Sequence, residues 1–209
     1  MNGKRAFKLI NNLLDKDQGN YYADFVPISF PDTAPEEYAE LADYLEKHYK
    51  PDFAEKIIFI ALTIRYYYPT NIFLDGSSED KRNILPEELA DLIREMIIDN
   101  RIGLNILFKN ADQYSLMRIE DGYDTIFCSL AGEGLSVVEQ SLSHQGLFLK
   151  QYDGAFGNEV QEADGGWQIR PNNRKGDHPH GGGRWKLFNT DKLRQRTAIL
   201  AADGTILRA

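Results

Sequence analysis

The chain contains a single cysteine among its 209 residues, so it can form neither an internal disulfide nor a cysteine-based metal centre. Cys128 lies in an apolar run, and we expect it to be buried, because a free cysteine behaves as a small apolar residue. Long apolar runs are missing too. The longest, Ile57–Ile64, is interrupted by Thr63 and is far shorter than the roughly 20 residues of a membrane-spanning helix.

Sequence signals for export and for common cofactors are also missing. The N-terminal residues lack a signal-peptide pattern, which predicts a soluble, cytoplasmic protein with no membrane partner. We find no P-loop, no dinucleotide fingerprint, no nucleophile elbow and no His-Glu-x-x-His motif. We therefore expect no cofactor and no metal ion, and nothing favours a small-molecule enzyme. His48 and His144 fall in helical patterns and are predicted to be structural or solvated.

Charge is distributed unevenly along the chain. Residues 1–150 carry 15 Lys and Arg against 25 Asp and Glu, whereas the last 59 residues carry 9 against 7. Within 170–196, eight basic residues face only two acids, Asp177 and Asp191. Such asymmetry is typical of chains whose parts bind different partners, including nucleic acids or acidic surfaces.

Apolar residues recur at helical spacing in several segments. The helices that this spacing predicts begin near Phe7, at Thr33–Glu36, at Phe53, at Pro86 and at Gly132. Ile57–Ile64 alone also fits a buried strand, and the length of its segment favours a helix. The cluster Tyr66–Tyr68 is interpreted as a buried helix end, with a binding edge as the alternative. Glu87–Glu88 is expected to be a solvated helix start.

Strand patterns alternate with these helices and define the fold class. In the first 150 residues, strands are predicted at Tyr21–Phe30, Asn71–Asp75, Leu104–Phe108, Tyr114–Ile119, Tyr123–Leu130 and Leu147–Gln151. Glu120–Asp121–Gly122 is expected to be a solvated hairpin turn. From Asn71 the order is β-α-β-β-β-α-β, which predicts an α+β fold with helices packed on one face of a mainly antiparallel sheet.

The remaining residues are interpreted as a separate small unit. Residues 1–150 form the acidic α+β domain, 151–166 a linker rich in glycine and acidic residues, and 167–209 a basic β-meander. The strands of the meander are predicted at Trp167–Arg170, Trp185–Phe188, Arg196–Leu200 and Thr205–Leu207. A segment of this size with few large apolar side chains rarely folds alone, so we expect it to pack on the N-terminal domain.

The long loop of the tail holds the candidate catalytic residues. His178 and His180 could exchange protons with a ribose 2′-hydroxyl, since histidine titrates near neutral pH. Arg184 and Lys186 would stabilise charge on a phosphate, and Asp177 would orient a histidine. The three glycines before Arg184 would let the backbone approach a phosphate. Together these residues suggest a metal-independent, RNase-like site.

Other interpretations of the tail stay open. The loop could be a solvated glycine loop that happens to carry two histidines, or His178 and His180 could bind a metal ion with Asp177. The two tryptophans, Trp167 and Trp185, could stack on bases or could instead form the core of the meander. The residues expected to bind nucleic acid are Arg170, Arg174, Lys175, Trp185, Arg194 and Arg196.

Three tail segments carry a family resemblance: Gly176–Phe188, Arg196–Leu200 and Asp203–Leu207. Together they resemble the C-terminal ends of bacterial polymorphic toxins of the contact-dependent inhibition and Rhs types, many of which are RNases. The acidic N-terminal part is similar in size and charge to the immunity proteins of these systems. The resemblance implies an RNA-directed tail and a protein partner, either a cognate toxin or an immunity protein.

We therefore predict a protein of the toxin–immunity class of interbacterial competition. Its acidic domain would bind a protein partner, and its basic tail would bind or cleave RNA. The alternative is a pure binding protein, an immunity or adaptor domain without catalytic activity.

Overall fold

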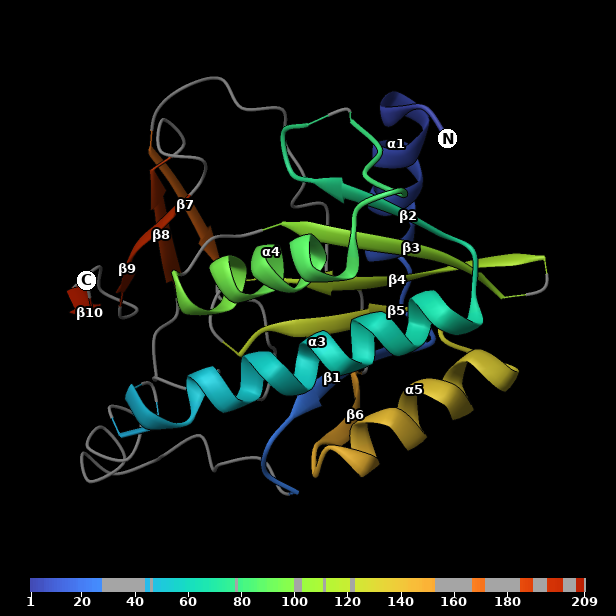
Figure 1. Ribbon diagram of the computed structural model, residues 1–209. Helices are drawn as coiled ribbons and strands as arrows, with labels where there is room; N and C mark the ends of the chain where they lie inside the picture. Colours follow the sequence, from blue (N-terminus) through green and yellow to red (C-terminus); the bar gives the residue numbers. More distant parts are fainter. Residues whose placement is uncertain are drawn as a thin grey trace.

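The structure is a computed structural model (Figure 1). It describes residues 1–27, 44–45, 47–77, 79–99, 103–110, 112–120 and 123–152, together with the backbone of four later strands between 167 and 208. The main body is α+β, as predicted. Its helices are α1 (Gly3–Leu14), α3 (Lys50–Tyr67), α4 (Pro86–Ile98) and α5 (Gly132–His144).

Six antiparallel strands form the main sheet, in the order β2-β3-β4-β5-β1-β6. Their bounds are β1 (Asn20–Asp24), β2 (Thr70–Leu74), β3 (Leu104–Asn110), β4 (Gln113–Ile119), β5 (Thr125–Cys128) and β6 (Phe148–Tyr152). The N-terminal strand β1 lies inside the sheet, between β5 and β6. Tyr22 is paired with Ile126 on one side and with Lys150 on the other.

Three helices cover one face of the sheet. Figure 1 shows α3 lying between α4 and α5 on this side. The core beneath them contains Phe53, Ile57 and Ile64 of α3, each with no exposed surface, and alternate strand residues such as Ile106 and Met117. Because successive strand residues point to opposite faces, this alternation fixes which residues meet the helices. We call α3, α4 and α5 the helical layer.

The first helix covers the opposite face. Ile10, Leu13 and Leu14 of α1 form a second apolar cluster with strand residues that include Leu107 and Leu116. The central strands of the sheet are therefore buried on both sides. The predicted packing of helices on one face is confirmed for the helical layer, and α1 adds a layer on the other side, which the order of elements from Asn71 could not reveal.

Local signals in the sequence explain where the helices begin and end. Pro51 and Pro86 occupy the first turns of α3 and α4, where a missing backbone N–H costs no helical hydrogen bond. At the end of α5, Gly146 has a φ of 68°, and its N–H donates to Ser143 while that of Leu147 donates to Leu142. These two bonds form a Schellman cap.

The four later strands form a second antiparallel sheet in the order β10-β9-β8-β7. They are β7 (Trp167–Pro171), β8 (Trp185–Asn189), β9 (Gln195–Leu200) and β10 (Ile206–Arg208). Each strand pairs with its neighbour in the chain, as a meander requires. The proposed linker lies mostly outside the described residues, as does the predicted helix start at Thr33–Glu36.

Candidate functional site

Most of the predicted catalytic loop lies outside the described residues. This holds for Asp177, His178, His180 and Arg184, and also for the basic residues Arg174, Lys175 and Arg194. The RNase-like site therefore stays a prediction.

Four of the predicted tail residues fall on strands whose backbone is described. Arg170 of β7 is paired with Lys186 of β8, and Trp185 of β8 is paired with Pro171 of β7. Arg196 of β9 is paired with Phe188. Positions directly opposite each other in an antiparallel pair share one face of the sheet. The meander therefore places the basic positions 170 and 186 next to each other.

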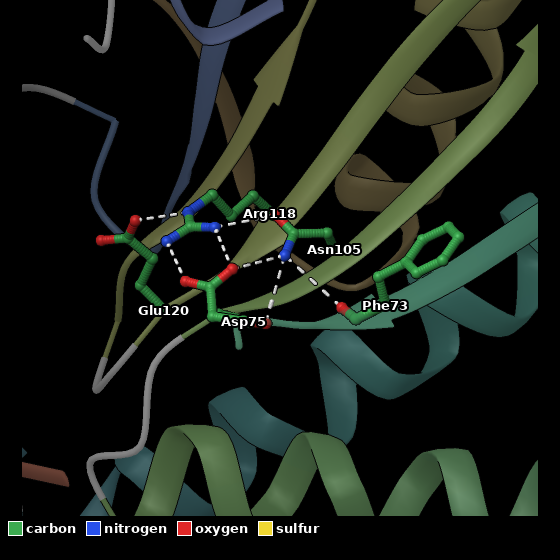
Figure 2. A network of polar contacts seen from close by, with 6 residues as sticks. Phe73, Asp75, Asn105, Arg118 and Glu120 are labelled. Carbon is green, nitrogen blue, oxygen red and sulfur yellow. Dashed lines mark hydrogen bonds and ion pairs between the residues drawn. The ribbon is translucent and has the colours of Figure 1, made fainter. Parts of the chain in front are cut away.

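The main body contains a buried polar cluster that the sequence analysis did not identify (Figure 2). Its centre is Arg118 of β4, whose side chain has no exposed surface. The Nη1 and Nη2 groups donate to the two carboxylate oxygens of Asp75 at 3.0 and 2.8 Å. Nη1 also donates to Oδ1 of Asn105 at 2.8 Å, and Nε donates to Glu120 at 2.7 Å.

The charges of this cluster compensate one another. Burial by itself lowers the pKa of Arg118, but the carboxylates of Asp75 and Glu120 outweigh that effect and raise the pKa above its usual value. Asn105 completes the cluster by donating from its amide nitrogen to Asp75 at 2.8 Å. Glu120, expected in a solvated turn, is instead 16% exposed and bound to Arg118.

We interpret the Arg118 cluster as structural. A catalytic group must reach a substrate, but the side chains of Arg118 and Asp75 have no exposed surface and hold each other in place. Figure 2 shows Asp75, Asn105 and Glu120 surrounding the guanidinium near the ends of β2, β3 and β4. Removing one partner of such a pair leaves a buried charge without compensation, so the cluster constrains which strands can lie together.

The other candidate reactive residues of the body lie on separate elements. Cys128 is fully buried, as expected, and desolvation raises the pKa of its thiol to about 12. His48 packs against Tyr44 with ring centroids 4.6 Å apart, and His144 is exposed at the end of α5. In the described part of the chain, no group of His, Cys, Asp and Glu could hold a metal ion.

The helical layer carries more acidic than basic residues. It has eight acidic residues and four basic residues, and among the basic ones Lys50 is buried. Lys56 is bound to Asp52 at 2.9 Å, and Arg94 bridges Glu55 at 2.6 Å and Asp91 at 2.8 Å. The acidic residues of the layer are Asp52, Glu55, Glu87, Glu88, Asp91, Glu95, Glu133 and Glu139.

Helix α1, on the opposite side of the sheet, has the reverse charge, although Asp15 and Asp17 follow it directly. Helix α1 carries Lys4, Arg5 and Lys8, all exposed, and no acidic residue. The helical layer thus has an excess of acidic residues, whereas α1 is basic. On α5, Glu133 and Glu139 are exposed and, within the described residues, make no ion pair.

The aromatic cluster at the end of α3 differs from its prediction. Only Tyr68 is buried, with 9% of its surface exposed. Tyr66 and Tyr67 are 83% and 58% exposed, and their rings meet edge to face at 5.5 Å. Phe59, two turns earlier, is 47% exposed. The interpretation of Tyr66–Tyr68 as a buried helix end is therefore wrong for two of its three residues.

Comparisons with known proteins leave the family open. No protein-family model, no curated protein and no solved structure matches the chain. In the part of the chain that the structure describes, no helix has the length and apolar character needed to cross a membrane.

Proposed function

We propose that this chain belongs to the toxin–immunity class of interbacterial competition and acts by binding a basic protein partner through its helical layer. The observation that supports this proposal is the excess of acidic residues in the helical layer, in contrast to the basic helix α1 on the other side of the sheet. Acidic residues outnumber basic ones by two to one in the helical layer, and α1 on the other side is purely basic among its charged residues. A surface of one sign attracts a partner of the opposite sign and speeds their encounter.

The binding proposal is tested with purified basic domains of bacterial toxins. We expect association to slow steeply between about 0.01 M and 0.15 M ionic strength, because the range of a charge falls from roughly 30 Å to 8 Å. The double variant Glu133→Gln/Glu139→Gln should associate more slowly than the unmodified protein at low salt. Both acids are exposed and make no ion pair among the described residues, so the fold should be unaffected.

A matched control removes the same charge on the other side of the sheet. Asp15 and Asp17 are exposed just after α1, and the variant Asp15→Asn/Asp17→Asn should associate at the unmodified rate. Equal slowing in both double variants would show a general effect of net charge. A salt-independent association rate would remove the electrostatic basis of the proposal.

The C-terminal meander supports a second function, the binding of RNA. The observation that favours it is the pairing of Arg170 with Lys186 within a segment rich in basic residues. Phosphate contacts make affinity depend on salt, with a logarithmic slope of about −0.7 per phosphate for single strands. The variant Arg170→Ala/Lys186→Ala should flatten that slope.

Binding and cleavage by the tail can be separated. His178→Ala or His180→Ala should leave RNA affinity nearly unchanged and abolish cleavage, since a proton-transfer group acts in the transition state. Cleavage should also persist in EDTA. A protein that neither binds nor cuts RNA at low salt would leave only the binding function of the helical layer.

A further inference from the structure

One side of α3 carries a line of apolar side chains that extends from the edge of the core into solvent. Leu62 and Tyr66 follow Phe59 by three and seven residues, which places the three on one side of the helix. Phe59 and Tyr66 are exposed, and Leu62 between them is half-buried. Tyr67 lies about 100° further round the helix, and its ring contacts that of Tyr66. We call these four residues the aromatic ridge.

The fold does not require the exposed members of the aromatic ridge. Helix α3 already packs on the sheet through Phe53, Ile57 and Ile64, which have no exposed surface. A tyrosine that is 83% exposed gains little from burial in this structure. Scattered exposed apolar residues are ordinary, but large apolar side chains that gather on one side of a helix mark an interaction site more often. Tyrosine and phenylalanine are also enriched in protein interfaces.

The ridge lies in the middle of an acidic surface. Helix α3 is between α4 and α5 (Figure 1), and these neighbours carry exposed Glu87 on one side and exposed Glu133 and Glu139 on the other, while Asp91 of α4 is bound to Arg94. Charges at the rim of an apolar site select the partner by sign. A second copy of this chain would bring two acidic layers together, and an anionic lipid surface or a nucleic acid would be repelled.

We propose that the aromatic ridge is the anchor of the helical layer's binding site and that it takes a Lys- and Arg-rich protein segment with an apolar centre. The apolar centre covers Phe59, Leu62 and Tyr66, and the basic flanks face the acids of α4 and α5. This inference rests on the proposed binding function and specifies the chemistry of its partner.

The test uses the full chain and a synthetic amphipathic helical peptide with leucine and tryptophan on one side and lysine on both flanks. A second peptide of the same design carries glutamate in place of lysine. We expect the lysine peptide to bind and the glutamate peptide to bind at least about tenfold more weakly. Equal binding of the two peptides, or no binding of the lysine peptide, would overturn the basic character of the partner.

Variants of the ridge locate the site. Phe59→Ser/Tyr66→Ser should weaken binding of the lysine peptide about tenfold, mainly through faster dissociation, as expected for interface anchors. The control Phe148→Ser removes an aromatic side chain that is 40% exposed on the edge strand β6, outside the helical layer. It should bind like the unmodified protein. Thermal unfolding of each variant checks that the fold is intact.

The outcomes separate this inference from the proposed function. If Glu133→Gln/Glu139→Gln slows association but Phe59→Ser/Tyr66→Ser has no effect, the helical layer binds basic partners and the ridge is not its anchor. If neither variant changes binding, both proposals fail. Sedimentation of the full chain provides a further check. If the unmodified protein is a dimer and the variant Tyr66→Ser is a monomer, a second copy occupies the ridge, and the inference is overturned.

Discussion

Arg118 and Asp75 form an ion pair with two hydrogen bonds, of 3.0 and 2.8 Å, and neither side chain has any exposed surface. Asp75 follows the last residue of β2, Arg118 lies near the end of β4, and the guanidinium faces the carboxylate (Figure 2). This pairing joins β4 to the end of β2 across β3. The stability of the sheet should depend strongly on it.

The first prediction is that Arg118→Met lowers the free energy of unfolding by about 3–5 kcal/mol, because the carboxylate of Asp75 loses its compensating charge in a buried place. Urea denaturation measures this loss. The same substitution at Arg94, whose ion pairs are on the surface, should leave the unfolding midpoint near that of the unmodified protein. A similar midpoint for both variants would contradict the importance of the buried pair.

The second prediction compares two glycines with positive φ. Gly146 has a φ of 68° and open space where a β-carbon would lie, so Gly146→Ala should cost about 1–2 kcal/mol through backbone strain alone. Gly103 has a φ of 90°, and a β-carbon there would overlap the carboxyl group of Asp75. Gly103→Ala should therefore be clearly more destabilising in urea denaturation. Equal losses would mean that Asp75 can move without cost.

The third prediction concerns acid stability and Asp80. Burial raises the pKa of this carboxyl group, but hydrogen bonds from Asn71, Ile72 and Arg82 outweigh burial and hold the pKa below its ordinary value of about 3.9. A depressed pKa in the folded state contributes stability above the unfolded pKa and loses it as the pH falls through the folded pKa. The stability advantage over Asp80→Asn should thus be constant near neutrality and shrink below about pH 4.

A pH series of urea denaturation curves for both proteins measures that difference. The control variant is Asp17→Asn, which removes an exposed acid and should give stabilities that run parallel to those of the unmodified protein across the series. A constant difference between Asp80→Asn and the unmodified protein down to strong acid would contradict the prediction.

The fourth prediction is that Cys128 resists thiol reagents. Burial raises the pKa of its thiol to about 12, and only the thiolate reacts. In the folded protein, modification by a disulfide reagent should therefore follow the rate of unfolding. In concentrated urea the single thiol should react at once. Fast modification of the native protein would show that β5 opens without global unfolding.

Much of the local structure of the body could be predicted from the sequence, for physical reasons. Helices α4 and α5 begin where predicted, at Pro86 and Gly132, because an apolar period of 3.6 residues and, for α4, a proline at its first position are local signals. Most strand bounds agree within a few residues, because alternation with a period of two residues and flanking turn residues are local signals too. The meander also follows from local turns, and its four strands pair in chain order.

Long-range pairing could not be predicted in this way. The position of β1 between β5 and β6 depends on contacts between distant segments, as does the face that α1 covers. The burial of Arg118 is similar, since its partners Asp75 and Asn105 lie on or beside other strands. The apolar pattern of α3 favours burial of Tyr66, and only the packed structure shows which side of the helix meets the sheet.

The place of β1 in the sheet has a consequence for the order in which the protein can fold during translation. Both neighbours of β1 are made long after it, since Tyr22 is paired with Ile126 and Lys150. At about 5–20 residues per second, the ribosome needs roughly 5–20 s to make the hundred or so residues between β1 and β5. During that interval β1 must wait with its backbone unpaired, while β2, β3 and β4 can already assemble as neighbouring antiparallel strands.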